Sequence, residues 1–174
     1  MDLKLIYGNM RALCEAPQMM LYYADIPYEY KMVWDHYGSS WAEVKKDIIF
    51  NRLPILIINE DRYIWQSNTI IRYLSNLTKT KPSDEFQLAY CDAVFESTHE
   101  MFSPLNPTIN MTFGEKYNSN KKKLLEDILP NSLNNFEKLL QNSSGNFFIG
   151  NDPYYCDFNA YHHFSMCLIL DKNI

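Results

Sequence analysis

The chain has 174 residues, enough for one ordinary domain or for two small domains that share a boundary. Apolar residues make up 47% and charged residues 21%, so a hydrophobic core can form and wholesale disorder is excluded. The net charge of −5 does not favour a nucleic-acid partner. No apolar stretch approaches the roughly 18 residues that a membrane span needs, and polar residues interrupt the N-terminus too early for a signal peptide. We therefore expect a cytoplasmic protein with no membrane span.

The first half of the sequence alternates strand and helix signals. Residues 3–7 form a short apolar-rich run that predicts a first strand, and a helical pattern with Pro17 in its first turn follows to residue 24. Residues 28–33 alternate like a second strand. The run 53–58 is the most apolar strand candidate, and a polar turn connects it to a strand at 62–65. This order predicts a parallel pair from a strand-helix-strand unit, and then a hairpin.

Two further helices are expected in this half. Ser39 and Ser40 are favoured helix N-caps, and after them Val44, Ile48 and Ile49 would face inward from a helix that begins at Trp41. A second helix would open at residues 66–68 and continue through residue 74, with its apolar side chains spaced for one buried face.

The composition and the spacing of apolar residues change after residue 77. A Thr/Lys/Pro/Ser-rich stretch predicts a linker at 78–83, and beyond it helical spacing dominates at 85–102, 121–140 and 157–170. We therefore expect a first domain at 1–77 with a βαβ-ββα order, and an all-helical domain at 84–174.

Metal and disulfide chemistry are not expected. The four cysteines at positions 14, 91, 156 and 167 show neither zinc-finger nor CxxC spacing. The adjacent His162 and His163 project in different directions on a helix and lack partners four residues away. Cys14 near a helix start could have a lowered thiol pKa, although an inert packed thiol is the commoner outcome.

Three features could contribute to a ligand site. Pro54 cannot donate to a strand ladder, so it must stand at the start of its strand; a cis bond there would turn backbone groups toward a ligand, but a trans proline on an edge strand is favoured by the residues alone. Gln66 and Ser67 stand where a helix begins, and its free N–H groups could bind a carboxylate or phosphate, although a plain N-cap is the favoured interpretation of Ser67 taken alone. Tyr7 ends the first strand, where its side chain could point into a cleft.

Several segments together resemble the cytosolic glutathione S-transferases, nearest to the sigma and pi classes, over essentially the whole chain. These segments are residues 7–11, 50–54, 66–74, 148–150 and the pair Asp157-Phe158. The resemblance implies an α/β plus all-α fold, in which a thioredoxin-like βαβ-ββα domain precedes a helical domain.

The resemblance also implies the site. Tyr7 would be the catalytic tyrosine, whose hydroxyl donates to the sulfur of glutathione. The remaining glutathione-binding residues would be Trp41, Lys45, Arg52, Leu53, Pro54, Gln66, Ser67 and Glu100. Pro54 would be cis, and the Leu53 backbone would pair with the cysteinyl part of glutathione. Glu100 would reach the γ-glutamyl ammonium from the partner subunit. Phe50 would be an aromatic wedge in a homodimer interface.

The function implied is activation of the glutathione thiol for attack on a small hydrophobic electrophile, as in detoxification, or glutathione-dependent isomerisation of a lipid peroxide such as a prostaglandin precursor. Glutathione would be a co-substrate, with no other cofactor and no metal. Gly8 replaces an aromatic residue and Leu13 an arginine that the family keeps. These departures leave open a non-catalytic module that binds glutathione or another ligand, or that dimerises. A thiol transferase that uses Cys14 is a third hypothesis.

The C-terminal end departs from the family most. Members of the family continue past the equivalent of Leu170 with further helices, so we expect the helical domain to be C-terminally shortened. An apolar helix surface would then be exposed around residues 164–170.

Overall fold

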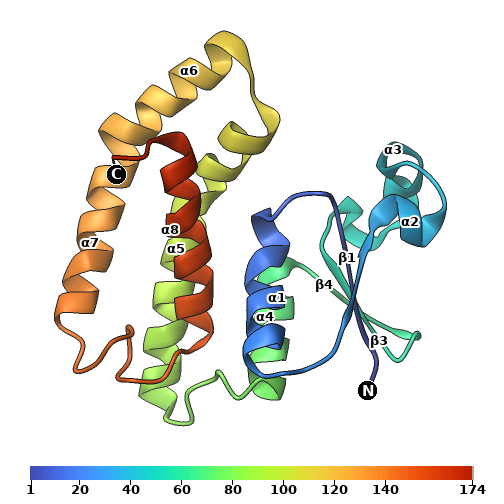
Figure 1. Ribbon diagram of the computed structural model, residues 1–174, viewed down its shortest axis with the longest axis horizontal. Coiled ribbons are helices and arrows are strands. Elements are labelled where there is room, and N and C mark those ends of the chain that lie inside the picture. The colour runs from blue at the N-terminus through green and yellow to red at the C-terminus, as the bar shows by residue number, and fades with distance from the viewer. Residues whose placement is uncertain (174) are drawn as a thin grey trace. The chain divides into compact units, whose positions relative to one another are not determined.

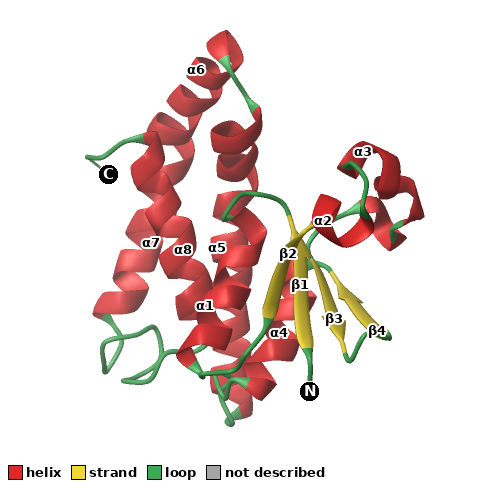
Figure 2. Cartoon of the chain, turned by 45° about the vertical axis from the view of Figure 1, so that its right-hand side comes forward, coloured by secondary structure: helices red, strands yellow, loops and turns green. Residues whose placement is uncertain are grey.

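A computed structural model describes residues 1–173 and divides the chain into two compact units, with the boundary between Lys81 and Pro82. Figure 1 traces the two units in chain order, and Figure 2 shows that the strands belong to the first unit only. The described part of the second unit is helical. The predicted fold class, an α/β unit followed by an all-α unit, is confirmed.

The first unit is built on a mixed four-stranded sheet in the order β2-β1-β3-β4. Its strands are β1 (Leu3–Tyr7), β2 (Glu29–Met32), β3 (Ile55–Ile58) and β4 (Arg62–Trp65). β1 and β2 are parallel, and helix α1 (Glu15–Tyr23) forms the crossover that a parallel pair requires. β3 pairs antiparallel with both β1 and β4. The predicted parallel pair and the hairpin are therefore confirmed.

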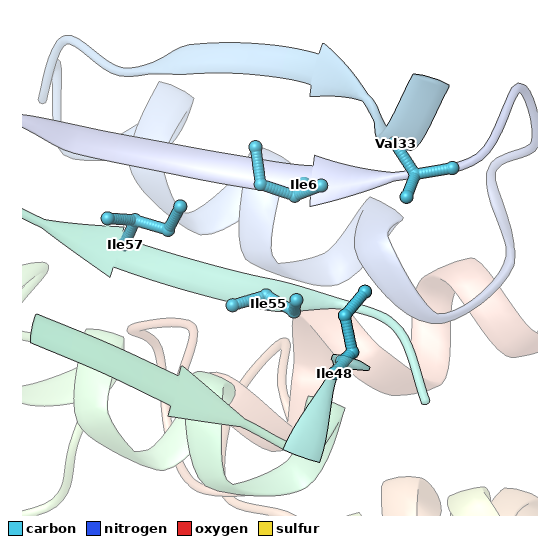
Figure 3. Packing of buried hydrophobic residues seen from close by; sticks show 5 residues of the cluster. All are labelled: Ile6, Val33, Ile48, Ile55 and Ile57. Atoms are coloured by element: carbon cyan, nitrogen blue, oxygen red, sulfur yellow. The ribbon is translucent and has the colours of Figure 1, made fainter. Parts of the chain in front are cut away.

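A cluster of buried aliphatic side chains packs on one face of this sheet. Ile6, Ile55 and Ile57 project from neighbouring strands and contact Val33 and Ile48, all at most 6% exposed. Figure 3 shows the five side chains together on the near side of the sheet. Each such burial contributes about 1.5–3 kcal/mol. The cluster therefore fixes the ends of β1 and β3, which carry the candidate site.

The opposite face of the sheet holds Leu5 and Leu56, which are paired across β1 and β3 and have no exposed surface. Helix α4 (Ser67–Leu77) packs against α1, and the buried side chains of α4 include Ile70, Ile71 and Leu74. In Figure 2 both helices lie on one side of the sheet.

In the segment between β2 and β3, the predicted helix start at Trp41 with Ser40 as N-cap is confirmed, but the predicted continuous helix is wrong. It contains a short helix α2 (Val33–Tyr37), a single turn α3 (Trp41–Val44) and two 3-10 turns, Lys45–Asp47 and Ile49–Asn51. Ile48 is buried as expected, but the inward placement of Ile49 is wrong, because its side chain is 53% exposed. The backbone becomes extended at Ile48 (φ −93°, ψ 126°), so helical spacing no longer determines which side chain faces the core.

The second unit consists of long helices. They are α5 (Glu85–Met111), α6 (Gly114–Lys123), a π-helical turn (Leu124–Ile128), α7 (Leu129–Gln141) and α8 (Tyr155–Leu170). α5 and α8 run side by side. Phe95 of α5 and Tyr155 of α8 meet edge to face, with ring centroids 5.3 Å apart, and the Tyr155 hydroxyl donates to the carboxylate of Asp92 at 2.9 Å.

Two helices are longer than the sequence predicts. α5 continues past residue 102 through Pro104 and Pro107, which remove backbone donors and normally end or kink a helix. Two side chains in this stretch bond back to the helix: the Thr108 hydroxyl donates to the Pro104 carbonyl at 2.8 Å, and the Asn110 amide donates to the Asn106 carbonyl at 3.2 Å. These bonds do not replace the donors lost at the prolines, whose helical partners would be the carbonyls of Glu100 and Ser103. Helical structure also resumes at residue 114, ahead of the predicted start at 121.

Asp157 connects the start of α8 to the loop before it. Its carboxylate accepts the backbone N–H of Tyr154 at 2.9 Å and that of Phe148 at 3.0 Å. Toward the end of this helix, Leu168 and Ile169 are 47% and 56% exposed. Met166, Cys167 and Leu170 are buried. The apolar exposure expected around residues 164–170 is therefore limited to Leu168 and Ile169.

No helix within residues 1–173 is both long enough and apolar enough to cross a membrane.

Candidate glutathione site

One end of the sheet in the first unit brings three chain segments together. Ile6 pairs with Ile55, and Ile55 pairs with Trp65, so these three residues form one row across the sheet. Tyr7 follows this row on β1, Pro54 precedes it on β3, and the start of α4 follows it on β4. The strand register therefore gathers residues that are up to about sixty positions apart in the sequence.

Tyr7 ends β1 with its side chain 6% exposed. Its hydroxyl oxygen accepts the backbone N–H of Leu13 at 3.3 Å, from the 3-10 turn (Ala12–Cys14) that leads into α1. Burial raises the pKa of Tyr7 above its ordinary value, the Leu13 N–H opposes this, and the nearby Cys14 adds to the increase. Tyr7 is therefore protonated at neutral pH, and its O–H can donate a hydrogen bond.

The peptide bond between Leu53 and Pro54 is cis. The trans bond favoured by the residues alone is wrong, and the cis bond implied by the family resemblance is confirmed. Pro54 is buried directly before β3, while Leu53 is half-buried against the Ile6 cluster. The chain reaches this bond through Phe50 and Asn51, which have positive φ angles of 65° and 50°.

Helix α4 begins at the same end of the sheet. Gln66 is the residue before the helix, with φ 71°, and its carbonyl accepts the first helical hydrogen bond, from the N–H of Ile70. Ser67 is the first helical residue and is 8% exposed. The first N–H groups of any helix have no acceptor within the helix and carry partial positive charge. The start of α4 can therefore bind a carboxylate, as its sequence suggests.

Trp41, Lys45 and Arg52 lie in the segment before Pro54. Trp41 is half-buried against the same cluster as Leu53, and the ammonium of Lys45 lies 6.0 Å from the centre of the Trp41 ring. Lys45 and Arg52 are both exposed, so either cation can reach an anionic group in solution. Their part in binding stays a prediction.

Glu100 belongs to the second unit. It is an exposed residue in the middle of α5. The structure therefore leaves its carboxylate accessible, and its role toward a ligand also stays a prediction.

Cys14 does not have the surroundings of a nucleophile. Its side chain has no exposed surface, and burial together with the charge of Glu15 raises the pKa of its thiol. A reactive cysteine needs the thiolate form and access to its substrate. Among residues 1–173, no group of three or more His, Cys, Asp or Glu side chains is placed to hold a metal ion.

Sequence reasoning missed two groups around Tyr7. One is the Leu13 N–H, a backbone donor that no residue type announces. The other is Tyr30 of β2, whose hydroxyl donates to the Gly8 carbonyl at 2.7 Å. The parallel pairing of β1 and β2 was predicted, but placing Tyr30 also required the register of that pair.

Comparison with known proteins gives the same fold and family. Residues 1–76 match the glutathione S-transferase N-terminal domain, and residues 99–173 match the C-terminal domain. The chain is 27% identical over 177 residues to glutathione S-transferase P of Caenorhabditis elegans, covering 99% of the chain and 80% of that protein. It is 30% identical over 159 residues to hematopoietic prostaglandin D synthase of Rattus norvegicus, covering 89% of the chain and 74% of that protein.

Solved structures agree. The pi-class glutathione S-transferase of Onchocerca volvulus superimposes with a TM-score of 0.83 at 27% identity, covering 99% of this chain and 80% of that one. The rat prostaglandin D synthase in complex with a quinoline gives a TM-score of 0.86 at 25% identity, with 99% and 83% covered. The two family models together span most of the sequence. The chain therefore belongs to the glutathione S-transferase family.

Proposed function

We propose that this protein is an enzyme that binds glutathione at the end of the sheet where β1 ends, and that Tyr7 activates the glutathione thiol. The observation that carries the proposal is the state of Tyr7. Its hydroxyl is protonated, its oxygen is oriented by the Leu13 N–H, and it stands at the same sheet end as the cis Pro54 and the start of α4.

Each part of glutathione has a matching group in this arrangement. The γ-glutamyl carboxylate would bind at Gln66 and Ser67, where the helix start offers N–H donors. The cysteinyl part would pair with the backbone of Leu53, as an added strand pairs with a sheet edge. This placement leaves the sulfur beside the Tyr7 hydroxyl.

The charged groups farther out would hold the two ends of the tripeptide. Trp41, Lys45 and Arg52 would face the glycyl carboxylate, for which two exposed cations are suited. Glu100 of a second subunit would pair with the γ-glutamyl ammonium.

The chemical step requires a thiolate. A free thiol titrates near pH ~8.5, and lowering that pKa by about two units corresponds to about 2.7 kcal/mol of preferential stabilisation of the thiolate. One charge-assisted hydrogen bond from the Tyr7 hydroxyl, with help from helix-end dipoles, can supply this amount. The thiolate then attacks a small hydrophobic electrophile: a carbon–sulfur bond forms while the bond to the leaving group breaks, and the leaving group departs with that electron pair.

A second candidate function is isomerisation of a lipid peroxide with glutathione. The similarity to the rat prostaglandin D synthase favours it, because that relative matches 89% of the chain at 30% identity. The non-catalytic module is not favoured, since the relatives are named as transferases and synthases. Either reaction needs glutathione alone as co-substrate and is consistent with a cytoplasmic enzyme in detoxification or lipid metabolism.

Exposed aromatic side chains near Phe50 support a homodimer. Phe50 is 61% exposed and meets the edge of Trp65, with ring centroids 6.1 Å apart. Tyr63, which is 43% exposed and lies two residues before Trp65 on β4, stacks on the Trp65 ring. In sedimentation experiments, we expect the wild type to be a dimer and Phe50→Ala to be largely monomeric; a wild-type monomer would reject the dimer.

The proposed function is tested by two measurements on the same protein. We expect calorimetry to detect glutathione binding, and turnover of a chromogenic electrophile to fall at least tenfold in Tyr7→Phe while binding persists. Binding without turnover toward conjugation or isomerisation substrates would instead support the non-catalytic module. Cys14→Ser is expected to leave turnover unchanged, and a loss there would support the thiol-transferase hypothesis.

A further inference from the structure

Tyr30 lies beside the candidate catalytic residue although the sequence does not single it out. It stands on β2 opposite Leu5 of β1, and side chains paired across a sheet project from the same face. Tyr7 is two residues after Leu5, so it projects from this face as well. Burial raises the pKa of Tyr30, as do nearby groups that include Cys14 and Tyr7. The Tyr30 hydroxyl is therefore a protonated donor close to the Tyr7 side chain.

The hydroxyl of Tyr30 donates to the carbonyl of Gly8 at 2.7 Å, a short hydrogen bond. Gly8 directly follows Tyr7 and begins the loop that leads to α1. A Cβ atom built at Gly8 would meet only the terminal methyl of Met10, at 3.8 Å. Little side-chain packing is thus available to hold the start of this loop, and the Tyr30 hydrogen bond holds it through the backbone.

The far end of the same loop returns to Tyr7. Leu13 closes it by donating its N–H to the Tyr7 hydroxyl oxygen at 3.3 Å. The two hydrogen bonds therefore lie at opposite ends of the segment between residues 8 and 13. A shift of this segment moves the Leu13 N–H relative to the Tyr7 oxygen, and thereby changes the direction in which the Tyr7 O–H can donate.

We propose that Tyr30 is a positioning residue: by holding the Gly8 carbonyl, it keeps the Leu13 N–H on the Tyr7 oxygen, so that the Tyr7 O–H points at the sulfur of bound glutathione. This inference rests on the proposed function of Tyr7. In this role Tyr30 acts through its hydrogen bond to the Gly8 carbonyl.

The test is Tyr30→Phe, which removes one oxygen atom and keeps the ring. Tyr28→Phe is the matched control, because Tyr28 is also a tyrosine next to α1 but donates to the side chain of Gln18 at 3.3 Å and not to the loop. For Tyr30→Phe we expect kcat below neutral pH to fall about three- to tenfold, the range that one hydrogen bond supports, with KM for glutathione changed less than about twofold. The pH at which activity is half-maximal should rise. Tyr28→Phe should match the wild type in all three respects.

A double variant separates positioning from a general structural effect. In the Tyr7→Phe background the hydroxyl to be positioned is gone, so adding Tyr30→Phe should cause no further loss of kcat. The inference is overturned if the two losses multiply, or if Tyr30→Phe changes melting temperature and KM but leaves the pH profile at the wild-type position.

Failure of the proposed function has a different signature. If Tyr7→Phe itself leaves the pH profile and kcat unchanged, or if wild-type protein does not bind glutathione, both the proposed function and the role of Tyr30 are rejected. If Tyr7→Phe shifts the profile and Tyr30→Phe does not, the role of Tyr30 alone is rejected.

Discussion

Replacing His163 with glutamine is expected to remove much of the acid sensitivity of the helical unit. His163 is 1% exposed on α8, its ring stacks on Phe102 with centroids 3.9 Å apart, and its Nδ1 lies 3.2 Å from the carbonyl oxygen of Thr98. Burial lowers the pKa of His163 well below its ordinary value, and two neighbouring histidines add to this. His162 of the same helix and His99 of α5 lie at centroid distances of 5.4 and 6.1 Å.

The sign and size of the effect follow from this low pKa. A histidine in the unfolded chain titrates near pH ~6.5. Because the folded state binds fewer protons than the unfolded state, stability is lost as the pH falls through that value. Between about pH 7.5 and about pH 5, this residue alone can lower the free energy of unfolding by at most about 2 kcal/mol, the limit set by protonation of the unfolded chain.

Urea unfolding at these two pH values measures the effect, and the chain offers a probe for each unit. Circular dichroism reports largely on the long helices of the second unit, whereas the three tryptophans, at positions 34, 41 and 65, report on the first unit. By circular dichroism, the wild type should lose more stability than His163→Gln between the two pH values, by at most about 2 kcal/mol. His36→Gln, in the first unit, is the control and should behave as the wild type by this probe. Equal losses in wild type and His163→Gln would refute the reasoning.

Two further predictions concern backbone contacts. Asp157→Asn replaces a carboxylate that accepts two backbone N–H groups, so the free energy of unfolding, measured by circular dichroism, should fall by about 1–3 kcal/mol. Asp152→Asn, at an exposed position, is the control and should change it little. Equal stabilities of the two variants would contradict the account of how α8 begins. Gly8→Ala places its Cβ 3.8 Å from the terminal methyl of Met10, which is an ordinary contact. The free energy of unfolding from thermal unfolding should therefore change by less than about 1 kcal/mol. A loss above about 2 kcal/mol would contradict the open space at Gly8.

The sheet could be predicted from the sequence because its signals are local and strong. Residues 55–58 are all apolar and all buried, and the alternation of strand and helix before them determines which pairing is parallel. Within the segment 33–52 the helix start at Trp41 after Ser40 was predicted and is confirmed, but the rest could not be predicted, because its helices have four or five residues and periodicity needs a longer window. The length of α5 could not be predicted either, since it contains two prolines, and an interior proline normally ends or kinks a helix.

Some features of the candidate site could be predicted from the sequence, and others could not. The position of Tyr7 at a strand end and that of Ser67 at a helix start follow from the pattern, and both positions are confirmed, although their roles stay predictions. The cis bond before Pro54 required the family resemblance. The donors around Tyr7 required the structure, because a backbone N–H carries no residue signal and the Tyr30 contact depends on how β1 and β2 are aligned.

The ionisation of bound glutathione tests the central claim most directly. The thiolate absorbs in the ultraviolet, so its pH titration on wild-type protein and on Tyr7→Phe gives the thiol pKa in each complex. We predict a pKa about two units below the free value of ~8.5 on the wild type, and a value close to that of free glutathione on Tyr7→Phe. The same pKa in both complexes would contradict a role for the Tyr7 hydroxyl in activating the sulfur.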